Sequence, residues 1–352
     1  MSKKTKIIVL ILILLVVGGL VWWNAKSAGP SSKDTIKIGV ITGLTGPAAY
    51  WGESTRVGAE VAKSELEKQG YKVDLIYEDY QLDATKAVTA AQKLVNFDKV
   101  DVIYSEFNPA AIAVSSFLKD KKVVHIYDAA VTSPLKNSSY TFKTYLDYQA
   151  GCREVAKKFK EQGIKKLGVL KINMEAGELC LAGVKEVDNN VLVESYNLGD
   201  TNLSTQVAKL KNDQAESVIN AAFEGDTLNA LKAMSDLKMK AVYGTVADSI
   251  TENVIKKYST ELIGAQAFAF EAVDPTFITK AKTLAGKELA TYYGGAVAYT
   301  HIVQVVKSEN LCDREISCVV SKMAESVADK TIGFVKFNDR IAELKMVINN
   351  YK

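Results

Sequence analysis

The sequence predicts an α/β protein in which two doubly wound parallel-sheet units follow an N-terminal apolar segment. Three observations predict this class. Short apolar runs alternate with helical patterns from Ile36 onward, the alternation restarts after Tyr145, and residues 7–23 carry no charge. Near-continuous apolar strands separated by helices of about ten to fifteen residues are typical of a parallel sheet that helices cover on both faces.

The composition narrows the class further. The chain has 352 residues, 48% hydrophobic and 24% charged, which excludes a disordered, collagenous or small disulfide-rich protein. Four of the 44 Lys and Arg residues and none of the 41 acidic residues lie within residues 1–32, so the remainder carries 40 basic and 41 acidic groups. This near-neutral remainder predicts no binding to nucleic acid. With two histidines and no Cys-x-x-Cys motif, no metal centre is expected.

Residues 1–26 are predicted to be a membrane anchor or a signal segment. Met1–Lys6 is basic, and Ile7–Trp23 is an apolar run long enough to span a bilayer. The lysines are expected to stay cytoplasmic, which would place the rest of a single-pass protein on the extracytoplasmic side of the cell membrane. The alternative is a signal peptide cleaved near Ala25–Ser27, which would leave the protein secreted or periplasmic.

The linker and the first unit come next. Residues 27–35 are small and polar and are predicted to be a linker. The strands and helices of the first unit are predicted in the order strand 36–43, helix 51–69, strand 73–79, helix 84–96, strand 100–105, helix 110–119 and strand 123–128.

The alternation continues in a second unit and a tail. The second unit is predicted as helix 147–162, strand 166–172, helix 177–187 and strand 191–197, followed by further elements at 204–212, 217–223, 227–237 and 241–245. Helices are expected in the tail from Pro275, at 295–307 and near 319–328. Two closing strands flank Asp339-Arg340 and are expected to form a hairpin.

A repeated spacing supports two similar units. Asn108 and Thr132 follow successive strands of the first unit and are 24 residues apart, as Glu224 and Asp248 are in the second. One offset of 116 residues relates both pairs. The sequence therefore predicts two lobes of similar architecture.

Four cysteines in an exported chain predict two disulfide bonds. Cys312 and Cys318 are six residues apart and are expected to pair locally, which leaves Cys152 to pair with Cys180. The alternative is four unpaired thiols in the core.

A ligand of a parallel sheet binds beyond the carboxyl ends of its strands. The predicted strand-end loops are 43–51, 105–109, 128–134, 173–177, 223–226 and 245–249. If the two units face each other, these loops line one cleft.

Three residues in these loops suggest a binding chemistry. Thr132 lies beside Ser133 among successive backbone N–H groups and suits a carboxylate, whereas Asp248 either suits an ammonium group or caps the next helix. Trp51 is either a core residue or an apolar wall of the pocket. The glycines before Trp51 do not follow a G-x-G-x-x-G pattern, so a dinucleotide cofactor is not expected.

Five segments carry a resemblance to a known family: IKIGVITGLTGPAAYWGESTRVGAEVA, YEDYQLDATKAVTAAQKLV, VTSPL, YTFKT and GFVKFN. With them, the chain resembles the type I periplasmic binding proteins over about residues 36–351. The most similar group is the leucine/isoleucine/valine-binding subfamily that serves ABC transporters.

The resemblance implies two Rossmann-like lobes that close on a small ligand like a clamp. The lobes would be joined by three hinge crossings, near 144–147, 268–273 and 328–331. Lobe 1 would comprise 36–145 plus 272–329, and lobe 2 would comprise 146–271 plus 330–352.

The resemblance also implies a set of ligand-binding residues. Trp51 would pack on the side chain of the ligand. The first lobe would meet the head group of an amino acid through Asn108, Val131 and Thr132. The second lobe would complete the site through Asp248 and either Phe223 or Glu224.

Two departures from the subfamily bear on the ligand. The loop Asn173–Gly177 has Ala176 where the subfamily often has an aromatic residue in an N-x-x-Y-G pattern. Asn108-Pro109 replaces a more usual serine-rich stretch and removes a backbone donor. Leucine is therefore not assumed as the ligand.

The function predicted first is capture of a small amphiphilic ligand, an amino acid or a related compound, for the permease subunits of an ABC transporter. The alternative is a membrane-tethered sensor that uses the same clamp to signal through a partner protein. An enzyme is not expected, because the chain has no Ser-His-Asp arrangement, G-x-S-x-G or paired-carboxylate motif. A transcription factor would need a helix-turn-helix before Ile36, where the apolar run stands.

Overall fold

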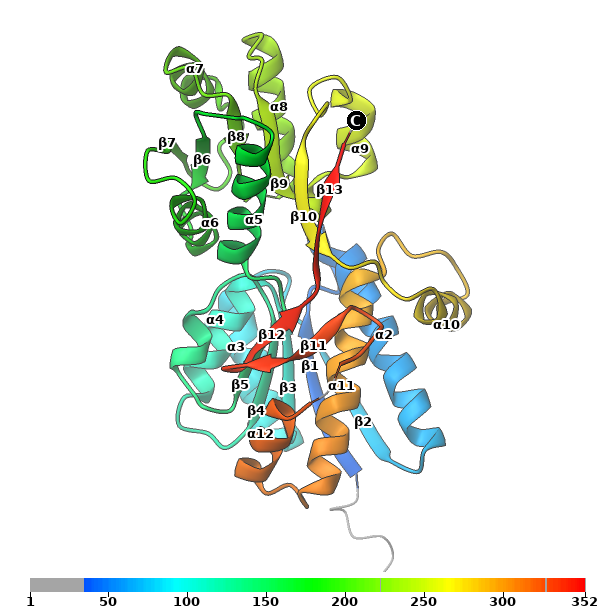
Figure 1. The fold of residues 1–352 in the computed structure, drawn as a ribbon. Helices are drawn as coiled ribbons and strands as arrows, with labels where there is room; N and C mark the ends of the chain where they lie inside the picture. Colours follow the sequence, from blue (N-terminus) through cyan, green and yellow to red (C-terminus); the bar gives the residue numbers. More distant parts are fainter. Residues whose placement is uncertain (1–34, 222, 327, 352) are drawn as a thin grey trace, which may run out of the picture.

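The computed structural model describes residues 35–351 except 222 and 327, and it has two α/β lobes joined at a narrow waist (Figure 1). The sheet of the first lobe, below the waist in Figure 1, has seven strands, and the sheet of the second has six. The predicted pair of α/β lobes is thereby confirmed.

The predicted membrane segment, residues 7–23, lies outside the described residues. Within residues 35–351, with the two gaps, no helix has both the length and the apolar character needed to cross a membrane.

The sheet of the first lobe has the order β11-β12-β5-β4-β3-β1-β2. Its strands are β1 (Thr35–Thr42), β2 (Lys72–Asp79), β3 (Val102–Glu106), β4 (Val124–Asp128), β5 (Thr141–Lys143), β11 (Phe334–Asn338) and β12 (Ile341–Leu344). Strands β1 to β5 pair in parallel. Every residue of β3 and β4 is buried, as expected for a parallel sheet covered on both faces.

Helices cover both faces of this sheet. They are α2 (Ala49–Lys68), α3 (Ala84–Lys93), α4 (Phe107–Leu118), α10 (Pro275–Ala285), α11 (Tyr293–Leu311) and α12 (Ile316–Ala324), with the short turns η2 (Gly46–Ala48), η3 (Leu94–Asp98) and η4 (Ser133–Lys136). Ile38 and Val102 pack in the cluster that includes α2 and α11, whereas Ile41 and Ile103 pack in the cluster under α3 and α4. Neighbouring strand residues thus serve opposite faces.

Two glycines allow the close crossing of α2 and α11. A Cβ atom on Gly58 would overlap the carbonyl oxygen of Gly295 in the facing helix. The Ser54 hydroxyl accepts a hydrogen bond from the backbone N–H of Gly295 at 3.0 Å. This packing fixes the start of α2, where Trp51 lies.

The sheet of the second lobe has the order β13-β10-β9-β8-β6-β7 and is parallel except for the pair β10–β13. Its strands are β6 (Gly168–Ile172), β7 (Leu192–Tyr196), β8 (Ser217–Ile219), β9 (Val242–Val246), β10 (Gln266–Phe270) and β13 (Met346–Asn350). Its helices are α5 (Tyr148–Glu161), α6 (Glu175–Lys185), α7 (Ser204–Asn212), α8 (Glu224–Asp236) and α9 (Glu252–Tyr258), with the turn η5 (Ala247–Ser249).

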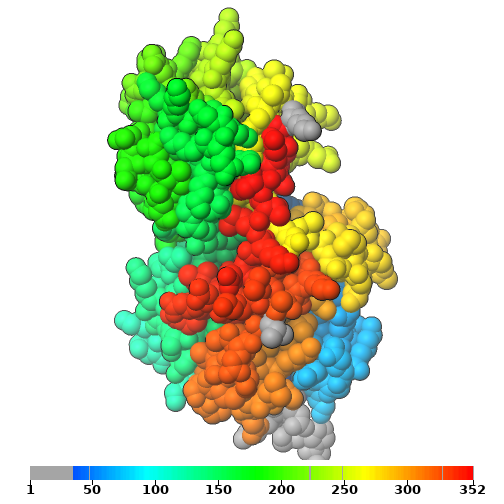
Figure 2. Space-filling model, in the orientation of Figure 1, coloured from blue at the N-terminus to red at the C-terminus, as the bar shows by residue number. Residues whose placement is uncertain are grey.

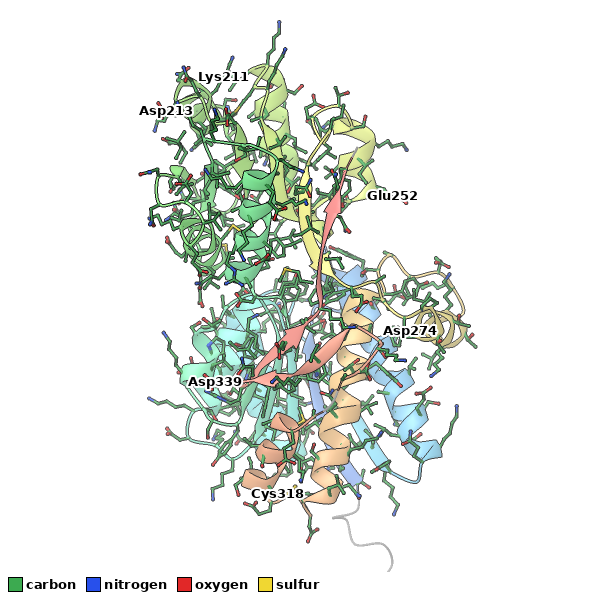
Figure 3. All side chains as sticks on the ribbon, in the orientation of Figure 1. Lys211, Asp213, Glu252, Asp274, Cys318 and Asp339 are labelled. Atoms are coloured by element: carbon green, nitrogen blue, oxygen red, sulfur yellow. A yellow bond between two sulfur atoms is a disulfide. The ribbon has the colours of Figure 1, made fainter. Side chains whose placement is uncertain are left out.

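The chain crosses the waist three times. The first two crossings, between β5 and α5 and between β10 and α10, lie close to those expected. At the second, Asp274 (Figure 3) caps α10 by accepting hydrogen bonds from the backbone N–H groups of Thr276 at 2.6 Å and Phe277 at 3.4 Å.

The third crossing corrects the predicted division of the chain. Strands β11 and β12 form the expected hairpin around Asp339-Arg340, but both belong to the first sheet, so residues 334–344 are not part of lobe 2. The chain crosses at Lys345, and Figure 2 shows the C-terminal segment passing over the waist. Because a single residue separates β12 from β13, the sequence gives no sign that the chain changes sheets there.

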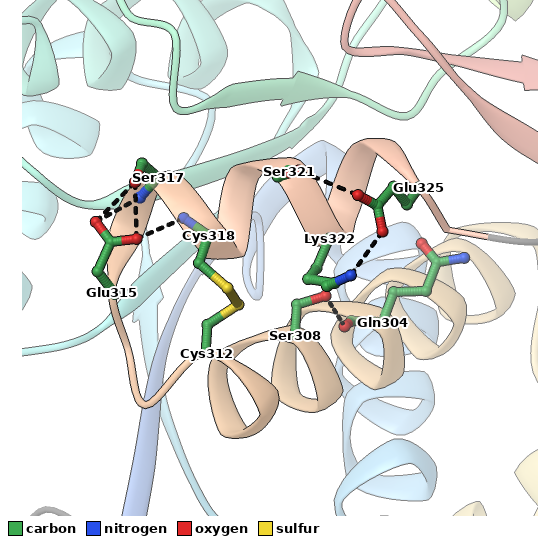
Figure 4. The surroundings of a disulfide bond; sticks show 9 residues. All are labelled: Gln304, Ser308, Cys312, Glu315, Ser317, Cys318, Ser321, Lys322 and Glu325. Carbon is green, nitrogen blue, oxygen red and sulfur yellow. Dashed lines mark hydrogen bonds and ion pairs between the residues drawn. A yellow bond between two sulfur atoms is a disulfide. The ribbon is translucent and has the colours of Figure 1, made fainter.

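Two disulfide bonds join the pairs expected from the sequence, Cys152–Cys180 and Cys312–Cys318. The first connects α5 to α6 inside the second lobe, where both cysteines are buried. The second closes the turn between α11 and α12 (Figure 4). In this turn Glu315 caps α12, because its carboxylate accepts a hydrogen bond from the backbone N–H of Cys318 at 2.7 Å.

Candidate ligand-binding site

The carboxyl ends of both parallel sheets lie at the waist. In Figure 1, β1 runs from the far end of the first lobe up to the waist, and β6 in the second lobe leads into α6 at the waist. The strand-end loops of the two lobes therefore face each other, which is where ligands of such sheets bind.

One carboxylate connects these loops directly. Glu175, the first residue of α6 in the second lobe, accepts hydrogen bonds from residues that follow β4 in the first lobe. Its Oε1 accepts from the Thr132 backbone N–H at 2.7 Å, the Thr132 hydroxyl at 3.1 Å and the Ser133 backbone N–H at 3.2 Å. Its Oε2 accepts from the Ser133 hydroxyl at 2.9 Å. The four donors of Thr132 and Ser133, hereafter the carboxylate cradle, thus hold both oxygens of one carboxylate.

The surroundings of the cradle favour a negative charge. Burial raises the pKa of Glu175, but the hydrogen bonds from Thr132 and Ser133 outweigh it, so the net shift lowers the pKa and keeps the group ionised. The buried ammonium of Lys143 also interacts electrostatically with Glu175. Arg340 lies in the turn between β11 and β12. Its guanidinium stabilises the segment that follows the cradle by donating to the carbonyl oxygens of Leu135 at 3.0 Å and Ser138 at 2.6 Å.

The sequence singled out Thr132 as a carboxylate donor but did not single out Glu175. The loop Asn173–Gly177 is among the expected site loops, but Ala176 is the residue that the sequence singles out there. The sequence does contain one indication of Glu175: it is an acidic residue just before a predicted helix, in an expected site loop. Its partner could not be found from the sequence, because the contact depends on how the lobes meet.

Trp51 lies mostly in the interior of the first lobe. Its side chain is 8% exposed, and its ring lies 6.1 Å from that of Phe107 and 6.0 Å from that of Tyr293, measured between centroids. The adjacent Tyr50 is 52% exposed. Of the two alternatives for Trp51, the core position fits this burial, and Tyr50 is the aromatic residue that this end of α2 presents to solvent.

A buried carboxyl group lies beside Trp51. Glu106, the last residue of β3, accepts hydrogen bonds from the hydroxyl groups of Thr42 and Thr55. Burial, together with the nearby charge of Asp128, raises the pKa of Glu106 to about 8. Glu106 is therefore mostly protonated at neutral pH.

Asn108 and Val131 lie in the loops that lead to the cradle. The Asn108 amide oxygen accepts a hydrogen bond from the backbone N–H of Ala130 at 3.1 Å, so it ties the loop after β3 to the loop after β4. Val131 is buried, and its carbonyl oxygen accepts from the Tyr127 hydroxyl at 3.0 Å. Both residues hold the chain just before Thr132.

The residues expected from the second lobe lie on two of its strand-end loops. Phe223 precedes α8 and is 53% exposed, and its backbone N–H donates to Asp226 at 3.3 Å. Glu224 accepts from the Asn253 amide at 3.0 Å. Asp248 lies in the turn η5, and its side chain is outside the part of the chain that the structure describes.

Aromatic rings connect the two lobes at the crossings. Phe270, at the end of β10, stacks on Tyr293 of α11 with ring centroids 4.0 Å apart. Tyr145, on the first crossing, lies 5.6 Å from Phe270 and 6.3 Å from Tyr293. This cluster continues through Trp51 into the first lobe, so the same rings pack on the hinge and on the start of α2.

A separate cavity lies away from these loops. It has a volume of about 620 Å³ and is lined by parts of 162–164, 234–242 and 260–263 in the second lobe. It lies at the opposite ends of β8 and β9 from the strand-end loops, and it is unrelated to the cradle.

The chain matches the family model described as periplasmic binding protein over residues 35–326, and it belongs to that family. The leucine-, isoleucine-, valine-, threonine- and alanine-binding protein of Pseudomonas aeruginosa is 28% identical over 193 residues, which are 51% of each chain. The Leu/Ile/Val-binding protein of Escherichia coli is 26% identical over 200 residues, 53% of this chain and 54% of the relative. The chain thus spans about half the length of these relatives.

Solved structures show the same fold. The solute binding protein of an ABC transporter from R. palustris, in complex with 4-hydroxybenzoate, superposes with a TM-score of 0.77 at 20% identity, covering 90% of this chain and 93% of the other. A leucine binding protein from Thermotoga maritima has a TM-score of 0.77 at 16% identity, with 90% and 95% covered. The predicted resemblance to type I periplasmic binding proteins is confirmed.

Proposed function

We propose that this chain is an extracytoplasmic solute-binding protein of an ABC transporter. It captures a small carboxylate-bearing amphiphile between its lobes and delivers it to permease subunits. Family membership supports the class of protein. The named ligands of its relatives and structural neighbours, branched-chain amino acids and 4-hydroxybenzoate, support an amino acid or an aromatic acid as the ligand class.

The observation that carries this proposal is the carboxylate cradle. Thr132 and Ser133 offer four donors at the end of a parallel strand, and all four are within 3.2 Å of carboxylate oxygens of Glu175. Hydrogen bonds to a charged group contribute about 1.5–3 kcal/mol each. Part of this gain is offset by ordering the ligand and closing the lobes, so affinities on the order of micromolar are expected.

The rest of the ligand would lie toward the second lobe. The ring of Phe223, which is exposed at a strand-end loop of the second lobe, would pack on the apolar part of the ligand. Asp248 would bind the ammonium group if the ligand is an amino acid. An aromatic acid has no such group and would leave Asp248 without this role.

Calorimetry on the full chain tests the proposal from the side of the ligand. The panel contains L-leucine, L-isoleucine, L-valine, L-threonine, L-alanine, 4-hydroxybenzoate and 3,4-dihydroxybenzoate. At least one acid should bind, and its carboxamide, leucinamide or 4-hydroxybenzamide for example, should bind at least about tenfold more weakly because a carboxamide has no carboxylate to accept the hydrogen bonds of the cradle. Absence of binding by every acid, or equal binding of acid and amide, would contradict the proposal.

One substitution separates the two ligand classes. Asp248→Asn should weaken binding of an amino acid by about tenfold or more and leave binding of a hydroxybenzoate unchanged. Asp213→Asn, at the far end of α7 (Figure 3), is the matched control and should change neither.

A further inference from the structure

The carboxylate cradle already holds a carboxylate that belongs to the protein. Glu175 and the cradle come from different lobes, and 43 residues separate Glu175 from Thr132. The contact is therefore not a local turn. It exists only while the two lobes lie close together at this point of the waist.

Glu175 accepts hydrogen bonds from all four donors of the cradle. Three donors meet Oε1 and one meets Oε2, at distances between 2.7 and 3.2 Å. A ligand carboxylate has the same two oxygens and needs the same donors. Glu175 and a ligand carboxylate therefore exclude each other from the cradle.

Glu175 is held on a rigid support. A Cβ atom on Gly177 would overlap the carbonyl oxygen of Ile172, so α6 starts directly against the end of β6. The disulfide bond Cys152–Cys180 joins α6 to α5, which begins just after the first crossing. Glu175 thus moves with the second lobe as a body, and it leaves the cradle when the lobes separate about the crossings.

We propose that Glu175 is an internal competitor of the ligand, a latch that fills the carboxylate cradle and holds the ligand-free lobes together. This inference rests on the proposed function, because it assigns the cradle to a ligand carboxylate. Ligand binding then requires the latch to open, and the apparent affinity is lowered by the fraction of molecules that are latched. The latch weakens the apparent binding of every ligand that needs the cradle. The cradle discriminates between an acid and its uncharged analogue only in molecules in which Glu175 has left it.

The first test needs no ligand. Double electron–electron resonance on the full chain measures the distance between two spin labels, one in each lobe. The labels are attached at Lys119→Cys, at the end of α4, and at Lys185→Cys, at the end of α6. Because the four native cysteines are paired, only these positions react. Glu175→Ala should shift the ligand-free distribution toward an open form that the unsubstituted protein rarely populates.

Glu178→Ala is the matched control for this measurement. Glu178 is an acidic residue in the same first turn of α6, but it pairs with Lys171 of its own lobe. Glu178→Ala should therefore leave the distribution of spin-label distances unchanged. An unchanged distribution for Glu175→Ala overturns the latch, and it does so without bearing on whether the protein binds a solute.

The second test is the affinity for an acid probe, L-leucine or 4-hydroxybenzoate. Glu175→Ala should tighten binding by about tenfold if about nine-tenths of the molecules are latched. Weaker binding would overturn the latch, since Glu175 would then support the ligand instead of competing with it. If no acid of the calorimetry panel binds any form of the protein, the proposed function fails, while the spin-label result still decides the latch.

A double substitution tests the competition itself. Thr132→Ala removes one donor from both the latch and the ligand, so its effect on the apparent affinity should largely cancel in the presence of Glu175. In the Glu175→Ala background the same substitution should weaken the acid probe by about tenfold. Equal effects in both backgrounds would overturn the competition.

Discussion

Glu106 shows how a single buried side chain contributes to the pH response of the first lobe. Its pKa is raised from 4.5 to about 8, mainly by burial, so the folded state binds a proton that the unfolded state releases between these values. Its contribution to the free energy of unfolding is full below about pH 4.5 and is lost as the pH rises through about 8.

Glu106→Gln should remove this dependence. Denaturant unfolding at pH 5 and pH 8 should show the unsubstituted protein losing stability relative to the variant, by an amount on the order of a few kcal/mol. Glu67→Gln, an exposed position on α2, serves as the control and should track the unsubstituted protein at both values. A constant difference between the unsubstituted protein and Glu106→Gln at the two values would contradict the assignment.

At this scale the sequence identified residue types better than their surroundings. Thr132 was expected to meet a carboxylate, and in the structure it does, although the carboxylate belongs to Glu175. The sequence does not decide the burial of Trp51, because an indole next to glycines fits a core and a pocket wall equally. Both outcomes depend on contacts between segments that are distant in the sequence, and local chemistry does not contain that information.

The two disulfide bonds contribute at the scale of elements. Cys152–Cys180 closes a loop with a sequence separation of 28 between two buried helical positions, whereas Cys312–Cys318 closes one of 6 at the edge of the first lobe. Loop-closure entropy alone gives about 3.6 kcal/mol for the longer loop and about 2.2 kcal/mol for the shorter.

Replacing each pair by alanine should therefore produce unequal losses. The Cys152→Ala/Cys180→Ala protein should lose more unfolding free energy than the Cys312→Ala/Cys318→Ala protein, because it also leaves space in the core of the second lobe. The losses are measured by thermal and denaturant unfolding, and each variant serves as the control for the other. An equal loss, or a larger loss for the Cys312–Cys318 pair, would contradict this ranking.

Most elements could be predicted because their signal is local. The strands of both sheets are short apolar runs with helical patterns between them, and the structure has them near the predicted positions. The closing strand predicted after Asp339-Arg340 has the pattern of a single strand, but it divides at Lys345 into β12 and β13, which belong to different sheets. Pattern reveals that a residue is in a strand, and it does not reveal which neighbour the strand pairs with.

The whole molecule consists of two lobes that meet at their strand-end loops. Three crossings and a cluster of aromatic rings join the lobes, and Phe270 and Tyr293 stack across the second crossing. Rotation about these crossings changes the distance between the loops while each lobe keeps its own core. The ligand position that we propose, between these loops, would place the ligand in contact with both lobes at once.

Hydrogen–deuterium exchange of the full chain, with and without the acid that binds most tightly in calorimetry, tests this claim most directly. Binding between the lobes should slow exchange together in segments 129–134 of the first lobe and 173–177 and 223–226 of the second. Slower exchange confined to one lobe, or confined to the distant cavity around 234–242, would contradict the account.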